Sequence, residues 1–257
     1  MSRTFTTLAV LAVLAPVAPA DVPKGLSAAL ESYEKGATAA REEFARDVDR
    51  VIDTVRKSKA DAALVDKRLK ELKEQKTKYE EKGELPTHDL LLPATVEYLD
   101  RLHKARAEWH RVFKKETDEA KKAKDDARLA DLVKLRASLD KQFGSRDQLT
   151  AKSQWDGLRY GEEDAVGVHL NVTKVDENTF QGRYVQHPGS ASKVVMDVEG
   201  VFDGNAIEFA TTKVIEGGKR SFKFTGYFIE DRLILRLNGT VGAKATPVSS
   251  LVDMRKK

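Results

Sequence analysis

Apolar and polar residues alternate through residues 198–235, and they do so in two similar halves. Each apolar position of the second half lies 26 residues after its counterpart in the first: Val198, Gly200, Phe202, Ile207 and Phe209 are followed by Phe224, Gly226, Phe228, Leu233 and Leu235. A period of two places one face of a strand on a core and the other in solvent. Asp203 and Gly204 supply the positive-φ positions of a tight turn. Both halves are therefore predicted to be β-hairpins.

The same alternation continues over residues 153–257 and predicts eight strands. They cover roughly residues 153–160, 166–175, 179–186, 192–202, 206–214, 220–229, 232–238 and 246–255. Because the connections are short, neighbouring strands in sequence pair as neighbours in space and form an antiparallel meander. A meander of half-buried strands loses its exposed edges when it closes into an up-and-down β-barrel. A sandwich of two sheets is the alternative.

The first half of the chain has a helical period instead. Apolar residues recur in steps of three and four along residues 26–55, 65–79, 96–113 and 129–143, as in coiled-coil-like helices. Gly83 and Pro86 end the second of these patterns. The following loop contains Leu90, Leu91 and Leu92, which we expect to pack against the helices.

The helical half also repeats itself at a constant offset of 65 residues. Tyr33 matches Tyr98, and Asp61 matches Asp126. Around both aspartates the apolar pattern weakens, and an aspartate at such a point can cap a new helix. The repeat therefore predicts two antiparallel helical hairpins, with turns near residues 59–61 and 124–126. Two uninterrupted helices are the alternative, because neither turn contains Gly or Pro.

The composition assigns these patterns to an α+β chain with two segregated domains. Residues 21–143 form the helical domain, residues 144–152 a linker and residues 153–257 the β-barrel domain. The 45 basic residues nearly balance the 41 acidic ones, so nucleic-acid binding is not indicated. The sequence contains no Cys, which excludes disulfides and metal sites of the Cys type. We expect no metal and no cofactor.

The N-terminal residues predict export from the cytoplasm. Arg3 precedes the apolar run 8–14, and Ala18-Pro19-Ala20 offers small residues for a signal peptidase. Residues 1–20 are thus expected to be a signal peptide cleaved after Ala20, so that the protein is secreted or periplasmic. The apolar run is shorter than the roughly 20 residues that a membrane anchor needs. Short strands with charges on one face favour a soluble barrel over an outer-membrane barrel, and we expect no stable membrane insertion.

The turn lengths indicate where a binding site would lie. Minimal turns at one end of the barrel alternate with longer connections at the other end, at residues 161–165, 187–191, 215–219 and 239–244. Long loops on a rigid scaffold are where binding residues usually lie. The candidate ligand-binding residues at this mouth are Trp155, Tyr184, His187, Arg220 and Phe222. In the alternative, Trp155 and Phe222 only fill the barrel and His187 lies in solvent.

The first strand of the predicted eight-stranded meander contains Trp155 followed by Gly157. In this feature the meander resembles the calycin-like barrels of the lipocalin and avidin type. Long charged helices in front of such a barrel resemble those of secreted bacterial proteins of unknown function. The first resemblance implies a closed barrel with a general capacity for small ligands. It implies no catalytic residue, and the polar residues with which avidins hold biotin have no match here.

Together these features predict a secreted or periplasmic, non-enzymatic binding or interaction protein. Its partner would be a small apolar molecule or a component of the cell envelope, and its helices would serve packing or self-association. One alternative is a structural cell-envelope protein with a filled barrel. Another is a hydrolase-type enzyme that uses Glu162, Glu163 and Asp164, although no His or nucleophile stands near them. A pocket above about 300 Å³ with convergent polar groups inside the barrel favours binding, a filled core favours structure, and clustered titratable groups inside the barrel favour an enzyme.

Overall fold

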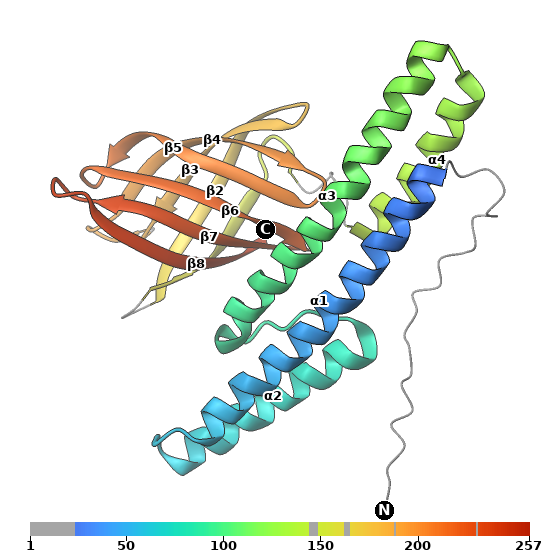
Figure 1. The fold of residues 1–257 in the computed structure, drawn as a ribbon. Helices are drawn as coiled ribbons and strands as arrows, with labels where there is room; N and C mark the ends of the chain where they lie inside the picture. The colour runs from blue at the N-terminus through green and yellow to red at the C-terminus, as the bar shows by residue number, and fades with distance from the viewer. Residues whose placement is uncertain (1–23, 144–148, 162–164, 188, 230) are drawn as a thin grey trace, which may run out of the picture. The chain divides into compact units, whose positions relative to one another are not determined.

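The computed structural model describes residues 24–143, 149–161, 165–187, 189–229 and 231–257. The helices come first along the chain and the strands follow them (Figure 1). The chain divides into two compact units, Met1–Lys122 and Ala123–Lys257. The division falls at a turn before the last helix, whereas the sequence predicts a linker at residues 144–152. The expected signal peptide, residues 1–20, lies outside the described residues. So do residues 144–148 of the linker and the acidic residues 162–164.

The helical half contains four α-helices, as the sequence predicts. They are α1 (Lys24–Arg56), α2 (Ala62–Lys82), α3 (Leu92–Ala123) and α4 (Asp126–Phe143), with the short 3-10 helix η1 (Asp89–Leu91) before α3. The Asp61 carboxylate accepts hydrogen bonds from the backbone N–H groups of Ala63 and Leu64 and so caps α2. The alternative of two uninterrupted helices is therefore wrong.

Aromatic side chains join three of these helices within the first unit. Phe44 of α1 is fully buried, and its ring centroid lies 4.7 Å from that of Tyr79 in α2 and 4.9 Å from that of Tyr98 in α3. Leu91 and Leu92 are also buried, as expected, whereas Leu90 is half-buried. No described helix combines the length and the apolar character that crossing a membrane requires.

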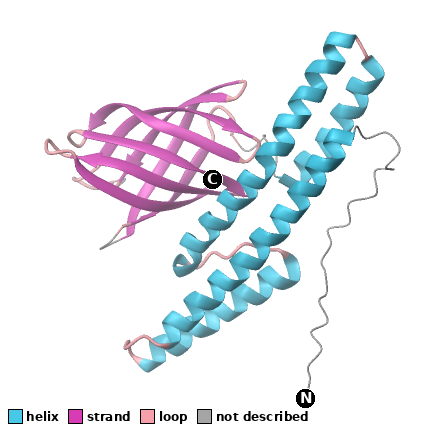
Figure 2. Ribbon diagram, in the orientation of Figure 1, coloured by secondary structure: helices cyan, strands magenta, loops and turns pink. Residues whose placement is uncertain are grey.

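The second half forms a closed eight-stranded antiparallel barrel in which each strand pairs with the next and β1 pairs with β8 (Figure 2). The strands are β1 (Gln154–Tyr160), β2 (Ala165–Asp176), β3 (Thr179–Gln186), β4 (Val194–Asp203), β5 (Ala206–Glu216), β6 (Arg220–Ile229), β7 (Arg232–Val241) and β8 (Thr246–Lys256). The predicted barrel is confirmed, and the sandwich alternative is wrong.

Two glycines occupy equivalent positions in successive hairpins of this barrel, as the repeat predicts. Gly200 of β4 pairs with Phe209 of β5, and Gly226 of β6 pairs with Leu235 of β7. A Cβ atom at Gly226 would lie 2.0 Å from the backbone oxygen of Ile234, and one at Gly200 would lie 2.2 Å from that of Glu208. The close approach of the strands therefore requires glycine at both positions.

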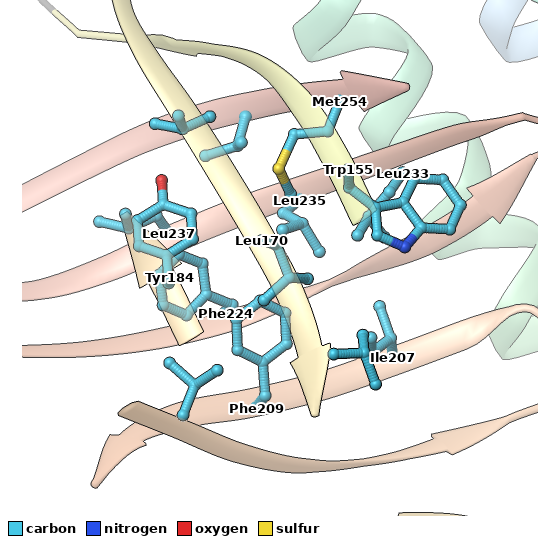
Figure 3. Close-up of a cluster of buried hydrophobic side chains, with 14 of the residues drawn as sticks. Trp155, Leu170, Tyr184, Ile207, Phe209, Phe224, Leu233, Leu235, Leu237 and Met254 are labelled. Carbon is cyan, nitrogen blue, oxygen red and sulfur yellow. The ribbon is translucent and has the colours of Figure 1, made fainter. Parts of the chain in front are cut away.

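Apolar side chains from all eight strands fill the middle of the barrel (Figure 3). The rings of Phe209 and Phe224 stack with their centroids 4.3 Å apart, and Tyr184 lies 4.8 Å from Phe224. Every second residue of a strand contributes to this core, because successive side chains of a strand point to opposite faces. The same alternation decides which polar residues point into the barrel.

Candidate functional site

Four polar side chains face the barrel interior near the end that carries the long connections. The first is Arg159 of β1, which lies on the same face of the strand as the fully buried Trp155. On β3, Tyr184 and Gln186 are both fully buried. The fourth residue is Arg220, the first residue of β6. We call Arg159, Tyr184, Gln186 and Arg220 the polar cluster.

A hydrogen bond across the interior connects two members of the polar cluster. Arg220 Nη1 donates to Gln186 Oε1 over 3.1 Å. Because β3 and β6 are not neighbours in the barrel, this bond must pass through the interior. Arg220 Nε also donates to the backbone oxygen of Gly217, 3.0 Å away in the preceding loop. The second bond holds the guanidinium at the long-loop end.

Three buried atoms of the polar cluster have no hydrogen-bond partner. They are Arg159 Nε, the Tyr184 hydroxyl oxygen and Gln186 Nε2. The two nitrogens can only donate hydrogen bonds, and a tyrosine hydroxyl can donate one. Leaving such a buried group unpaired costs about 1–3 kcal/mol. Three such groups at one end of a barrel are therefore an unusual feature of a folded core.

Burial and charge set the protonation of the cluster. Burial raises the pKa of the Tyr184 hydroxyl above its usual value, while the neighbouring Gln186 amide and the positive charge of Arg159 act against this rise. Burial lowers the pKa of Arg220, and the positive charge of Arg159 lowers it further. Tyr184 therefore keeps its proton at neutral pH. Arg159 therefore lies close enough to Arg220 for its charge to act on that guanidinium.

The interior of the barrel offers these arginines no countercharge from the strands. None of the inward-facing positions of the eight strands, as far as the structure describes them, carries Asp or Glu. The acidic residues of the strands lie on the outer face, where Asp197 pairs with Arg183 and Glu208 with Lys223. The polar cluster is thus an electropositive region inside a largely apolar barrel.

Four of the five predicted site residues lie toward this end of the barrel. Tyr184 and Arg220 belong to the polar cluster, and Phe222 follows Arg220 on the inner face of β6, where it is buried. His187 directly follows β3 and is half-buried, and its backbone N–H donates to the oxygen of Gly167. Whether these residues bind a ligand stays a prediction.

Trp155 does not lie at this mouth, so its predicted position is wrong. It stands near the start of β1, whereas the long connection 161–165 follows the end of that strand. Its ring packs against Phe228, near the tight turn at the end of β6. Figure 3 shows Trp155 and Tyr184 on opposite sides of the buried cluster. Trp155 fills the other end of the barrel, as the alternative expectation proposed.

Arg159 and Gln186 were not predicted from the sequence as site residues. Both lie at even spacing from predicted site residues, Arg159 four residues after Trp155 and Gln186 two residues after Tyr184. A strict use of the two-residue period would have found them. The described residues contain no group of three or more His, Cys, Asp or Glu side chains that could hold a metal ion.

Comparison of the sequence with protein-family models gives no match, and comparison with curated proteins gives none either. Among solved structures, the barrel resembles avidin-type barrels, as the sequence led us to expect. A biotin complex of a shwanavidin variant is 19% identical, with 42% of this chain and 97% of that chain covered and a TM-score of 0.34. The bradavidin2–biotin complex is 18% identical, with 42% and 99% covered and a TM-score of 0.34.

A third solved structure, intact afifavidin in its apo form, is 18% identical. The comparison covers 46% of this chain and 88% of that one, with a TM-score of 0.32. At identities and TM-scores this low, the similarity to these proteins does not indicate a ligand or a binding residue for this chain. The polar cluster has to be interpreted from its own geometry.

Proposed function

We propose that the barrel binds a small molecule at the polar cluster, and that the protein is a non-enzymatic binding protein. The observation that supports this is the set of three buried, unpaired polar atoms on Arg159, Tyr184 and Gln186. A ligand that accepts their hydrogen bonds removes the desolvation cost that each carries in the free protein. Small-molecule sites commonly combine an apolar wall with a few convergent polar groups.

The packing of the interior limits the size and position of this ligand. Stacked and edge-on aromatic rings such as Phe209, Phe224 and Phe180 occupy the middle of the barrel. A large apolar molecule along the whole barrel axis does not fit this packing. The ligand proposed here therefore lies at the long-loop end, and its recognition is polar in addition to apolar.

The filled middle of the barrel supports the structural alternative as well. In a purely structural barrel, however, apolar residues in place of the polar cluster would give a more stable core. The polar cluster is what distinguishes the two proposals. If the protein is structural, apolar substitutions there stabilise it and no binding is lost.

The chemistry of the cluster supports binding over catalysis. Arginine and glutamine side chains donate hydrogen bonds or hold charge, and an arginine does not act as a general base because it stays protonated. The Tyr184 hydroxyl is also a poor base, since burial raises its pKa and it keeps its proton. The residues of the polar cluster are thus suited to hold a ligand in place.

The binding proposal is tested on the full chain, purified without denaturation. Native mass spectrometry and a thermal-shift screen of small metabolites should identify a ligand that raises the melting temperature. Gln186→Met should remove this effect, whereas Gln181→Met, the same substitution on the outer side of β3, should keep it. A ligand that binds Gln186→Met as tightly as the unchanged protein, or one seen elsewhere in a crystal structure, contradicts the proposal.

Export and the role of the helices are part of the same proposal. Cleavage after Ala20 would leave a mature chain that begins at Asp21, and the helices would serve packing or self-association. N-terminal sequencing of protein recovered outside the cytoplasm tests the first point. Sedimentation of the mature chain over a range of concentrations tests the second. Full-length protein confined to the cytoplasm would contradict export.

A further inference from the structure

The polar cluster also specifies the chemistry of what it binds. We infer that the ligand is a small organic carboxylate whose anionic group lies between the guanidinium groups of Arg159 and Arg220. This inference rests on the proposed binding function and narrows it to one ligand class. It uses three independent features of the described barrel: charge, the direction of the hydrogen bonds, and the apolar side chains nearby.

The first feature is positive charge that has no countercharge on the inner face of the described strands. Arg159 and Arg220 both reach the interior, and the inward positions of the described strands offer no carboxylate to either. Two like charges in a partly buried site repel each other, and an anion between them converts this repulsion into two attractions. Arginine is suited to the task because its planar guanidinium matches the two oxygens of a carboxylate.

The second feature is that the unpaired groups are donors. Gln186 uses its oxygen to accept from Arg220, which leaves its nitrogen free and fixes the orientation of the amide. Arg159 Nε can only donate, and the protonated Tyr184 hydroxyl can donate as well. A ligand that meets these groups must supply acceptors. A carboxylate supplies two oxygens with several acceptor positions and carries the complementary charge.

The third feature is the apolar surface beside the cluster. Phe222 and Leu237 are buried on the adjacent inner faces of β6 and β7. Figure 3 shows the Tyr184 hydroxyl directed away from the aromatic core formed with Phe224. A fully hydrated inorganic anion gains nothing from Phe222 and Leu237. An organic acid gains from both its charged group and its apolar body.

The test is isothermal titration calorimetry of the full chain at low ionic strength and pH 7. The carboxylate probes are benzoate and octanoate, their neutral counterparts are benzyl alcohol and octan-1-ol, and inorganic phosphate is the third probe. At least one carboxylate should bind about tenfold or more tightly than its alcohol, as expected for charge-assisted hydrogen bonds. It should also bind more tightly than phosphate. Tighter binding of phosphate than of both acids overturns the organic carboxylate.

Variants then assign the binding to the two arginines. Arg159→Met and Arg220→Met should each weaken the carboxylate about tenfold or more, with little change for the alcohol. Arg220→Lys keeps the charge and should recover part of the loss. Arg183→Met changes an arginine on the outer side of β3 and should bind like the unchanged protein. Folding of each variant is checked by circular dichroism and thermal melting. Equal losses for acid and alcohol, or none, overturn the inference.

A further control concerns the chain's own acidic residues 162–164, which follow β1 in sequence and lie outside the described residues. A chain in which Glu162, Glu163 and Asp164 are changed to their amides is titrated in parallel. Similar or slightly tighter carboxylate binding in this variant supports the inference. Binding that occurs only in this variant overturns it, because the protein's own acids would then be the partner of the arginines.

The outcomes also separate this inference from the binding function beneath it. If a neutral ligand binds the barrel and depends on Gln186, whereas neither carboxylate binds, the binding function holds and the anionic ligand is wrong. If no ligand of any kind binds and the variants change only stability, both proposals fail. A crystal structure can also overturn the anionic ligand. It does so if ordered waters accept the hydrogen bonds of the polar cluster and stay in place when either acid is added.

Discussion

The side chain of Gln186 accepts a hydrogen bond from Arg220 across the interior of the barrel, from Nη1 to Oε1 over 3.1 Å. The two residues belong to β3 and β6, which share no edge. The bond therefore connects opposite sides of the barrel, at the end where the long connections lie. It fixes the Gln186 amide with its nitrogen unpaired, next to a Tyr184 hydroxyl that is also unpaired.

Removal of the Tyr184 hydroxyl should not weaken the ligand-free barrel. The hydroxyl is buried without a hydrogen bond, so Tyr184→Phe removes a desolvated group and keeps the ring against Phe224. We expect the free energy of unfolding to stay the same or to rise by about 1–2 kcal/mol. Urea denaturation in the absence of ligand measures the change.

The control is a variant that removes the ring as well. Tyr184→Leu loses the contact with Phe224 and should lower the free energy of unfolding by about 2 kcal/mol or more. A loss of more than about 1 kcal/mol in Tyr184→Phe would show that the hydroxyl forms a hydrogen bond in the free protein.

The strands could be predicted from the sequence because apolar residues alternate with polar ones along most of them. The predicted ranges 179–186 and 220–229 agree with β3 and β6 at both ends. Barrel closure followed from the short connections. Which side chains meet across the interior depends on the stagger of the strands around the barrel, and the hydropathy pattern does not contain that information. The contact between Gln186 and Arg220 is of this kind.

The misplacement of Trp155 has a different physical cause. A strand's first residues lie at the opposite end of the barrel from the loop that follows the strand, so Trp155 at the start of β1 belongs to the tight-turn end. Strand direction alone was sufficient to place it. Arg159 was missed because a charged residue at an inward position does not stand out in an apolar pattern.

The helix breaks were predictable without Gly or Pro because an aspartate marks each new start. The match between the two repeats is not complete, however. Asp61 caps α2, whereas at the second break Asp125 accepts from the backbone N–H of Arg128, one position earlier than the repeat indicates. Asp125 and Asp126 stand side by side in the sequence. The pattern therefore located the turn but not the capping residue.

An added methyl group should destabilise the protein more at Gly226 than at Gly25. A Cβ atom there would lie 2.0 Å from the backbone oxygen of Ile234, so the paired strands must separate. We expect Gly226→Ala to lower the free energy of unfolding by about 3 kcal/mol. Gly25→Ala in α1 is the control, since its nearest neighbour would be 3.6 Å away. Equal effects in chemical denaturation would show that the strands at Gly226 can move apart easily.

Loss of the Asp61 cap should weaken α2. The carboxylate accepts from two backbone N–H groups, at 3.0 Å for Ala63 and 3.2 Å for Leu64. Asp61→Ala should therefore lower the free energy of unfolding by about 1 kcal/mol, whereas Asp61→Asn should lose much less. Asp66→Ala, inside the same helix and exposed, is the matched control. Denaturation followed by the helical circular dichroism signal distinguishes a cap from a general loss of negative charge.

Asp156 stands in a hydrogen-bonded group on the outer side of β1. Its carboxylate contacts Lys257 Nζ at 2.5 Å and His169 Nδ1, and His169 Nε2 lies 2.8 Å from Asn171 Oδ1. Partial burial acts to raise the pKa of Asp156, but the bonds from Lys257 and His169 outweigh it and hold the pKa below its usual value. The ionised form is therefore favoured in the folded protein.

This pKa shift predicts how Asp156 affects stability in acid. A carboxyl group whose pKa is lower in the folded state stabilises the protein above its unfolded pKa of about 4, and the contribution is lost as the pH falls through the folded value. Asp156→Asn should thus reduce stability at pH 5, by no more than about 1 kcal/mol because the side chain is 42% exposed. The difference from the unchanged protein should shrink below pH 4 or so. Thermal melts from pH 5 to pH 2 test this, with Asp176→Asn as control, and a constant difference over this range contradicts it.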